Sequence, residues 1–579
     1  MLFILEHILV AALIVAAYFL HSFPSRWFQA AEKCLGRLAR RRALAVVGVG
    51  VLALAIRATL LPNVPVPKPG FHDDFGYLLA ADTFAHGRLA NPTHPMWIHF
   101  ESIHINQKPT YMSMYFPAQG LIMALGQVIT GNPWIGVWLS AGALCAAICW
   151  MLQGWLPPGW ALLGGLLAVM RLATFSYWAN CYCGGALAAI GGALVLGGLP
   201  RIRRRRRLRE AVLLGLGLAL LANTRPYESL FFGIPIAIAA GVWILGKKRP
   251  PWRELILRTV LPLALILTAT VAGMAYYFSR VTGSPLCIPY QVNIDTYIAV
   301  PYFPWQPLNL THQYHHADLE RFYLHDWQMD CYNDARRNPL LVLATKVWSM
   351  YCFFLGPLLA LPLVVMLAAN PRQFFRKSMS GKTGFLVAVF DATFIGVALP
   401  IYFIPHYMAA ITAAIYALVL QAMRYLRLWR WRGKPAGLGL VRAIPTACVL
   451  LFLLRAFAPQ LHIPTPVEWD HTWDSEHYQN LDRAQALGQL EALPGDQLVI
   501  VRYNRNHNSD NEWVYNRADI DSAKIVWARD MGDSGNAELI RYFPQRRVWL
   551  AEPDHAPPWL SPYPARPDPR TPSPAPATP

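Results

Sequence analysis

The residues best suited to acid–base chemistry lie in the segment F-H-D-D-F-G-Y at 71–77, where Asp73 and Asp74 are adjacent carboxylates. Two carboxylates this close repel each other, so either the pKa of one is raised or both bind a metal ion. Either state suits a general base that takes a proton from an incoming hydroxyl group. Residues 74–88 have a helical period, with Tyr77 on the apolar face, and acids at a helix start also serve as caps. The segment therefore predicts either catalysis or helix capping.

Histidines and one acid follow in the same region. His99, Glu101 and His104 are weak candidates for binding a divalent metal, because imidazole and carboxylate are common metal ligands. Their spacing matches no known zinc signature, and loop histidines are often simple surface residues. The same question arises further along the chain for His312, His315, His316, His325 and Asp326.

Three short segments combine polar and aromatic residues at the ends of apolar runs: S-Y-W-A-N-C-Y at 176–182, T-R-P-Y-E at 224–228 and P-H-Y at 405–407. Arg225 is suited to bidentate pairing with a phosphate group. The alternative is an interfacial arginine paired with Glu228.

The composition indicates the class of protein to which these residues belong. The chain has 579 residues, of which 55% are hydrophobic and only 15% are charged, whereas soluble proteins have roughly 25% charged residues. This excludes a soluble globular enzyme and a disordered scaffold, and it predicts a polytopic helical membrane protein. The net charge of +18 would suggest nucleic acid in a soluble chain, but here it is concentrated in five short connectors. No nucleic-acid partner is expected.

The five connectors are residues 21–42, 200–210, 246–258, 370–384 and 424–442, and they contain 28 Lys and Arg and three acids. The rest of the chain therefore carries a net charge of −7. Because basic connectors stay on the cytoplasmic side, these five are predicted to be cytoplasmic. Apolar runs between them predict about 12 transmembrane helices, near 2–20, 43–61, 132–154, 159–175, 184–199, 210–223, 228–245, 255–279, 340–368, 385–404, 407–423 and 439–458. A further helix at 120–130 is expected to lie on the outer surface, because counting it as a span would place Arg203 to Arg207 on the wrong side.

This topology divides the chain into seven regions. They are N-terminal helices with a basic connector (1–61), a first extracytoplasmic loop (62–131), transmembrane helices (132–279), a second extracytoplasmic loop (280–339), transmembrane helices (340–458), an extracytoplasmic α/β domain (459–556) and a Pro-rich disordered tail (557–579). The α/β domain is expected to have strands at 497–503, 524–528 and 547–551 and a helix at 476–493. The location is predicted to be the bacterial inner (plasma) membrane.

The nine cysteines include no C-x-x-C and are odd in number, so the sequence indicates neither a zinc site nor a full disulfide framework. Cys287 and Cys331 share the second extracytoplasmic loop, where oxidation is permitted, and a disulfide between them is left open.

An acid pair after an early span, helices in a large outer loop, many spans and an outer C-terminal domain together resemble the GT-C superfamily of glycosyltransferases. The protein O-mannosyltransferases and the lipid A aminoarabinose transferases are the most similar branches. Asp73-Asp74-x-x-Tyr77 resembles the family's D-E-x-x-Y, Gln107-Lys108-Pro109-Thr110 its E-K-P-P, and Thr224-Arg225-Pro226 a recurrent R-P. W-V-Y-N-x-A-D-I-D, here Trp513 to Asp521, is similar to a motif of a bacterial branch. The chain departs from the family at Gln107, where the family has Glu. The family often has a second acid in the next outer loop, which has no match here, and Asn180 is the nearest polar residue.

The resemblance implies a membrane-embedded glycosyltransferase that moves a sugar from a polyprenyl-phosphate donor to a hydroxyl acceptor at the outer face, with inversion. Asp73 would be the base, with Asp74 beside it, and Arg225 and Lys108 would neutralise the departing phosphate. The acceptor would be a glycan, lipid or protein, and a divalent metal is one option for a cofactor. The residues expected to contact substrate are His72, Tyr77, Lys108, Asn180, Tyr182, Arg225, Glu228 and His406.

Three alternatives stay open on sequence alone. A polysaccharide polymerase or ligase that uses undecaprenyl-diphosphate substrates would also need arginines at the outer face. A transporter predicts charges and broken helices near mid-bilayer, whereas the polar candidates here cluster at one face. A non-catalytic anchor for the C-terminal domain does not account for the paired acids.

Overall fold

The computed structural model describes residues 2–19, 25–205, 207–247, 249–465, 467 and 472–563, and most of these are helical. In this part of the chain nine helices are long and apolar enough to cross a membrane. They are α3 (Arg42–Thr59), α6 (Trp134–Trp155), α9 (Ala186–Arg205), α11 (Pro226–Leu245), α12 to α13 (Trp252–Thr282), α17 to α18 (Pro339–Ala369), α20 (Gly381–Ala398), η5 to α21 (Pro405–Leu426) and α22 (Ala436–Ala456). The chain is therefore a helical membrane protein.

Three further apolar helices accompany them: α1 (Leu2–Phe19), α7 (Pro158–Leu172) and α10 (Leu208–Ala222). Each of the twelve expected spans thus coincides with a helical segment, and nine of these segments, counted over the described residues, have the length and apolarity of a full crossing. The membrane-protein class is confirmed, and twelve crossings stay a prediction.

Small residues bring the helices of the bundle close together. A Cβ added at Gly191 of α9 would lie 2.9 Å from the carbonyl oxygen of Gly217 in α10. A Cβ added at Gly50 of α3 would lie 3.1 Å from the carbonyl oxygen of Gly142 in α6. Close backbone approach through small residues is how helices gain packing energy where lipid removes the hydrophobic driving force.

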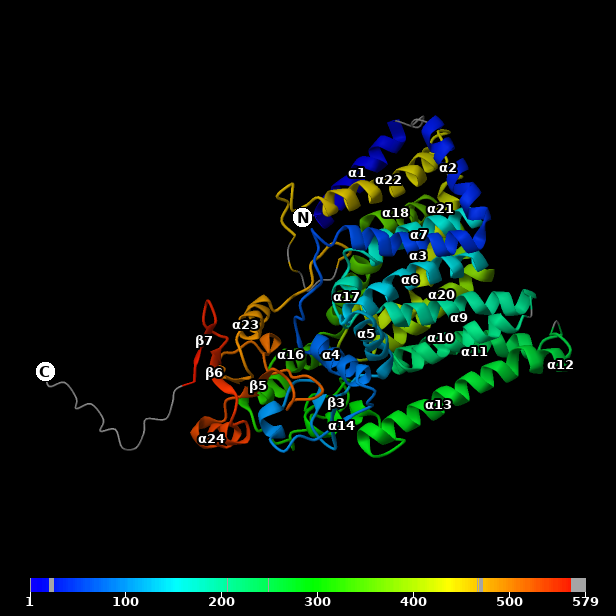
Figure 1. Cartoon of the computed structure of the whole chain (residues 1–579). Helices are drawn as coiled ribbons and strands as arrows, with labels where there is room; N and C mark the ends of the chain where they lie inside the picture. The colour runs from blue at the N-terminus through cyan, green and yellow to red at the C-terminus, as the bar shows by residue number, and fades with distance from the viewer. Residues whose placement is uncertain are drawn as a thin grey trace, which may run out of the picture.

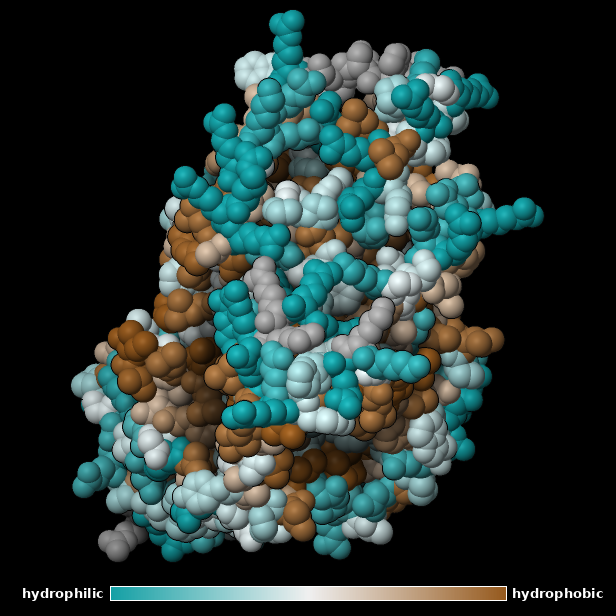
Figure 2. Space-filling view, turned by 90° about the vertical axis from the view of Figure 1, so that its right-hand side faces the viewer, coloured by the Kyte–Doolittle hydropathy of each residue, from teal (hydrophilic) through white to brown (hydrophobic). Residues whose placement is uncertain are grey.

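Different elements lie at the two ends of the helical bundle (Figure 1). One end has α2 (Ser25–Arg40) and α12 (Trp252–Leu255), and the opposite end has α4 (His72–Ala85), α5 (Pro117–Thr130), α14 (Pro289–Thr296), α16 (Trp327–Arg337) and the C-terminal domain. Figure 2 looks onto the α2 and α12 side, where hydrophilic residues gather. Arg203, Arg204 and Arg207 are exposed, while Arg206 lies outside the described residues. The basic connectors and the acid pair therefore lie at opposite ends.

The first loop is a compact layer around α4. Its short strands β1 (Asn91–Pro92), β2 (Ile105–Asn106) and β3 (Thr110–Ser113) form an antiparallel sheet in the order β1-β3-β2. α5 packs tightly on α4, since a Cβ added at Gly120 would lie 2.7 Å from that of Ala80. The helix expected at 120–130 is present, and its position on the membrane surface stays a prediction.

The C-terminal domain has a four-stranded sheet in the order β5-β4-β6-β7. The first three are parallel, namely β4 (Gln497–Val501), β5 (Ile525–Arg529) and β6 (Arg547–Glu552), and they match the expected strands. The expected helix is the shorter α23 (Leu481–Glu491), and α24 (Gly532–Tyr542) follows β5.

The Pro-rich tail departs from expectation at its start. Disorder was predicted from 557, but Trp559–Pro562 forms β7, antiparallel to β6. The prolines did not prevent this, because β7 is an edge strand with one unpaired side, and Trp559 also stacks on His555 at 3.6 Å. Residues 564–579 lie outside the described residues.

Candidate functional site

Asp73 is the centre of a polar group at the start of α4, the Asp73 cluster (His72, Asp73, His104 and Tyr115). Asp73 Oδ1 lies 3.0 Å from His104 Nδ1 and 3.3 Å from His72 Nε2. The Tyr115 hydroxyl donates to the same oxygen and lies 2.7 Å from His104 Nδ1. His104 has a φ of 61°, and its N–H donates to the Tyr323 hydroxyl at 3.0 Å. These contacts fix one carboxylate oxygen of Asp73, and no hydrogen bond from the described part of the chain reaches the other, Oδ2.

The Asp73 cluster also sets the charge of its carboxylate. Burial alone would raise the pKa of Asp73, but His72 and the hydrogen bonds from His104 and Tyr115 outweigh burial and hold that pKa well below its usual range. Asp73 is therefore ionised at neutral pH. Its side chain is 17% exposed, so Asp73 is only partly buried.

Asp74 points into different surroundings. Its Oδ2 accepts from the Gly70 N–H at 3.0 Å, and its Oδ1 accepts from the Tyr182 N–H at 2.8 Å. His477, from the segment that enters the C-terminal domain, places Nε2 4.0 Å from Oδ2. Burial raises the pKa of Asp74 to about 7, although these backbone amides oppose the rise. The two adjacent acids thus belong to separate networks.

Tyr77 connects the Asp73 cluster to Arg225. Its ring stacks on that of Tyr115 with centroids 4.4 Å apart, and the Tyr115 hydroxyl donates to Asp73. Tyr77 and Arg225 also line one small cavity, together with Gln119, Thr224 and the chain at Gly184 and Gly185. The Tyr77–Tyr115 pair therefore links the anionic Asp73 carboxylate to the wall of the cavity that Arg225 also lines.

Arg225 is held at the start of α11. Its Nη1 lies 3.3 Å from Glu228 Oε1, and its guanidinium lies over the Tyr407 ring at 4.5 Å. A guanidinium has five N–H donors, so an arginine paired with one carboxylate can still bind a phosphate. His406, next to Tyr407, is buried, and its Nδ1 lies 3.1 Å from the Tyr177 hydroxyl.

Three expected substrate contacts have other partners in the structure. Asn180 accepts from Arg57 Nη2 at 3.0 Å and donates to the carbonyls of Thr174 and Ser176. The Tyr182 hydroxyl donates to the carbonyl of Pro67 at 3.0 Å. Lys108 is exposed and lies 4.1 Å from the Trp97 ring centroid. None of the three belongs to the Asp73 cluster, and a role for them stays a prediction.

The expected metal candidates do not converge. His104 joins Asp73, whereas the Glu101 carboxylate accepts from the Tyr297 hydroxyl at 2.8 Å and pairs with His315 Nδ1 at 2.9 Å. His99 lies with Nδ1 3.4 Å from the carbonyl of Arg529. Within the described ranges, two groups bring together three or more side chains that could bind a metal: His72 with Asp73 and His104, and Asp74 with Cys181, Cys183 and His477. Cys287 and Cys331 are both free thiols, so the disulfide left open by the sequence is absent between these two residues.

Sequence reasoning missed Tyr115, Cys181, Cys183 and His477. Tyr115 falls in a loop without helical or strand period, and its role appears only once the chain folds back on α4. The C-Y-C spacing at 181–183 was visible next to Asn180, but it is not the C-x-x-C spacing that usually signals a metal.

No family model matches the chain, and no curated protein matches it either. Among solved structures, the fold is similar to the Archaeoglobus fulgidus oligosaccharyltransferase in its apo form, with 11% identity, a TM-score of 0.47, and coverage of 87% of this chain and 69% of the other. It is also similar to ArnT from Cupriavidus metallidurans bound to undecaprenyl phosphate, with 11% identity, a TM-score of 0.46, and coverage of 87% and 92%. Both similarities concern the fold alone.

Proposed function

We propose that the chain is a GT-C-type glycosyltransferase that moves a sugar from a polyprenyl-phosphate donor to a hydroxyl acceptor at the outer face of the bacterial inner membrane. The proposal rests on Tyr77, which stacks on Tyr115, the donor to Asp73, and lines the same small cavity as Arg225. This arrangement brings a carboxylate that can act as a base and a cation that can bind a phosphate into one site. The first loop, second loop and C-terminal domain are assigned to the outer face, opposite the arginine-rich connectors.

The reaction follows from the two charges. The acceptor hydroxyl donates its proton to Asp73 Oδ2 while its oxygen attacks the anomeric carbon. The bond between that carbon and the phosphate oxygen breaks, and the electron pair leaves with the phosphate. Attack from the side opposite the leaving group inverts the anomeric centre. His104 and Tyr115 are positioning residues, because they hold Oδ1 and so aim Oδ2.

Arg225 stabilises the departing phosphate. Negative charge grows on the phosphate as the bond breaks, and a preorganised cation is worth most where charge develops. Glu228 and the Tyr407 ring fix the guanidinium before substrate binds, which lowers the entropy cost of placing it. Tyr77, on the wall of the same cavity, is assigned to contact the sugar or phosphate.

Lipid analysis of cells that lack this chain tests the proposal. A transferase that uses a monophosphate donor predicts accumulation of a polyprenyl-monophosphate sugar, identified by mass spectrometry. Accumulation of a diphosphate-linked glycan would instead identify a polymerase or ligase. An unchanged lipid profile would support a transporter or an anchor and contradict the proposal.

A further inference from the structure

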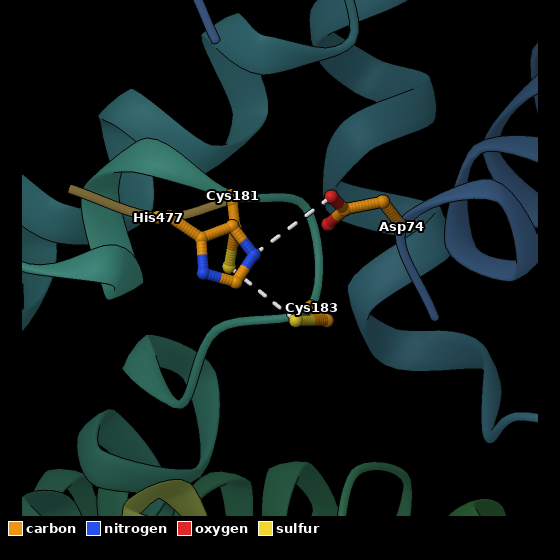
Figure 3. A group of neighbouring side chains, drawn as sticks. All are labelled: Asp74, Cys181, Cys183 and His477. Atoms are coloured by element: carbon orange, nitrogen blue, oxygen red, sulfur yellow. Dashed lines mark hydrogen bonds and ion pairs between the residues drawn. The ribbon is translucent and has the colours of Figure 1, made fainter. Parts of the chain in front are cut away.

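Four side chains of metal-binding types meet beside the start of α4, in the Asp74 cluster (Asp74, Cys181, Cys183 and His477). Each offers one ligand atom, and these atoms all lie within 4.8 Å of one another. The two sulfurs are 3.4 Å apart, and His477 Nε2 is 4.0 Å from Asp74 Oδ2. Figure 3 shows the imidazole, the carboxylate and both thiols turned toward a common centre.

The cluster is built from three distant parts of the chain. Asp74 belongs to the first loop, the cysteines to the turn between α8 (Tyr177–Asn180) and α9, and His477 to the segment before α23. All four are buried, with exposures of 0% to 5%. Chance proximity at a surface therefore does not explain the group, because the folded chain brings these residues into its interior.

We propose that the Asp74 cluster binds one Zn²⁺ ion. Thiolate, imidazole and carboxylate are the ligands of tetrahedral zinc, and four protein ligands are typical of structural sites. With Zn–S bonds of about 2.3 Å, a tetrahedron holds two sulfurs roughly 3.8 Å apart, close to the observed spacing. Binding releases the two thiol protons to solvent, and the ion replaces them as the partner of both sulfurs.

The neighbours of the cluster are arranged to orient its ligands. The N–H groups of Gly70 and Tyr182 hold the Asp74 carboxylate, and each carboxylate oxygen keeps a second lone pair for a metal. Tyr182 lies between the two cysteines, so the same turn supplies both thiols and a hydrogen bond to the third ligand. The His477 ring packs against Phe71 with centroids 5.0 Å apart. Such support is common around protein metal sites.

The ion would tie the C-terminal domain to the bundle. His477 is four residues from the start of α23, and Asp74 is in the first turn of α4, next to Asp73. A filled site would therefore fix both the domain and the helix start that carries Asp73. Asp74 is then a structural ligand and not a second base. This inference does not depend on the transferase proposal, because zinc content is measured without any sugar transfer.

Zinc content and a cobalt spectrum of the wild-type protein are the first test. The full chain is purified in detergent without chelators, and metal is measured by inductively coupled plasma mass spectrometry. We expect about one zinc ion per chain, in keeping with one four-ligand site. After exchange with Co²⁺, we expect the charge-transfer absorption of thiolate-bound cobalt. Absence of zinc after equilibration with ZnCl₂, together with absence of that absorption, would overturn the proposal.

Variants then locate the ion. Cys181→Ser, Cys183→Ser and His477→Ala are expected to lose zinc, His477→Cys to keep it, and Cys145→Ser to match the wild type, because Cys145 is a buried thiol of α6 outside the cluster. Zinc retained by all the cluster variants would contradict the site. Titration of thiols in the unfolded wild type, before and after reduction and with peptide mass spectrometry to identify any bonded pair, provides a separate test. A Cys181–Cys183 disulfide in place of the metal would overturn the proposal.

Discussion

Asp73 and Asp74 are neighbours in sequence, yet their carboxylates belong to different networks. Asp73 Oδ1 lies 3.0 Å from His104, whereas Asp74 Oδ1 accepts from the Tyr182 N–H at 2.8 Å and its side chain is fully buried. Successive residues of a helix are turned by roughly 100°, and this turn places the two acids on different faces of α4. The two acids therefore act separately: Asp73 is assigned to catalysis and Asp74 to a structural role.

Replacing Arg225 tests the phosphate assignment. Arg225→Gln is expected to lower the rate of transfer roughly 10²- to 10³-fold, because the developing phosphate charge loses its stabilising cation. Arg225→Lys keeps the charge but loses the planar fork, so it should recover only part of the rate. Rates are measured with membranes that contain equal amounts of each variant. Arg280→Gln, an exposed arginine at the end of α13, serves as the control, and a normal rate for Arg225→Gln would remove Arg225 from the site.

Removing His104 tests the positioning role. His104→Ala should slow transfer less than loss of Asp73, because Tyr115 still donates to Oδ1. His104→Asn keeps a donor and should recover part of the loss. The split between kcat and KM is the measurement: a positioning residue lowers kcat and leaves KM for the donor nearly unchanged. A pure KM effect would instead assign His104 to substrate binding.

The buried ion pair between α1 and α7 predicts a stability effect. Glu6 and Arg171 are both buried, and Glu6 Oε2 also accepts from Trp473 Nε1 at 2.9 Å. Arg171→Met should lower stability by about 3–5 kcal/mol, since it leaves a buried carboxylate unpaired. Adding Glu6→Gln should recover part of this loss, because the amide oxygen still accepts from Trp473. Thermal unfolding in detergent is the measurement, and the expected unfolding midpoints fall from the wild type to the double variant to Arg171→Met. Equal midpoints for all three would contradict the prediction.

The ion pair between Arg529 of the C-terminal domain and Asp318 of the second loop predicts that stability is sensitive to acid. Burial raises the pKa of Asp318, but Arg529 outweighs it, so the pKa of Asp318 is lowered in the folded chain. Its ionised form therefore adds stability above the pKa of unfolded Asp, about 3.9, and that stability is lost as the pH falls through the folded pKa.

Asp318→Asn should consequently lower the unfolding midpoint at neutral pH and flatten its decline below about pH 4. Asp295→Asn, an exposed acid of the same loop, is the matched control. A parallel pH profile for Asp318→Asn and the wild type would refute the assigned role of the Arg529–Asp318 pair.

Much of the membrane part could be predicted because local patterns determine it. The length of the apolar runs predicted the helices. The run of basic residues from Arg203 to Arg207 predicted that the basic connectors lie on the side opposite Asp73. Helical period placed the acids at the start of α4, which begins at His72. β4, β5 and β6 were likewise visible as short apolar runs. In each case the pattern that predicts the element lies within a short stretch of the chain.

The site could be predicted only in part, because its contacts are long-range. His477 meets Asp74 across about four hundred residues, and Glu101 pairs with His315 of another loop instead of with its sequence neighbours. No local period encodes either contact. β7 was missed for a related reason: its pairing with β6, and not its Pro-rich composition, makes it a strand.

The role of Asp73 as the base is tested by complementation in cells. Cells that lack the chain are complemented with the wild type, Asp73→Asn or the exposed control Asp533→Asn, at equal protein abundance, and the polyprenyl-phosphate sugar is quantified by mass spectrometry. If Asp73 is the base, the wild type and Asp533→Asn clear the lipid, and Asp73→Asn leaves it at the level of cells without the chain. Full clearance by Asp73→Asn would show that Asp73 is not the base.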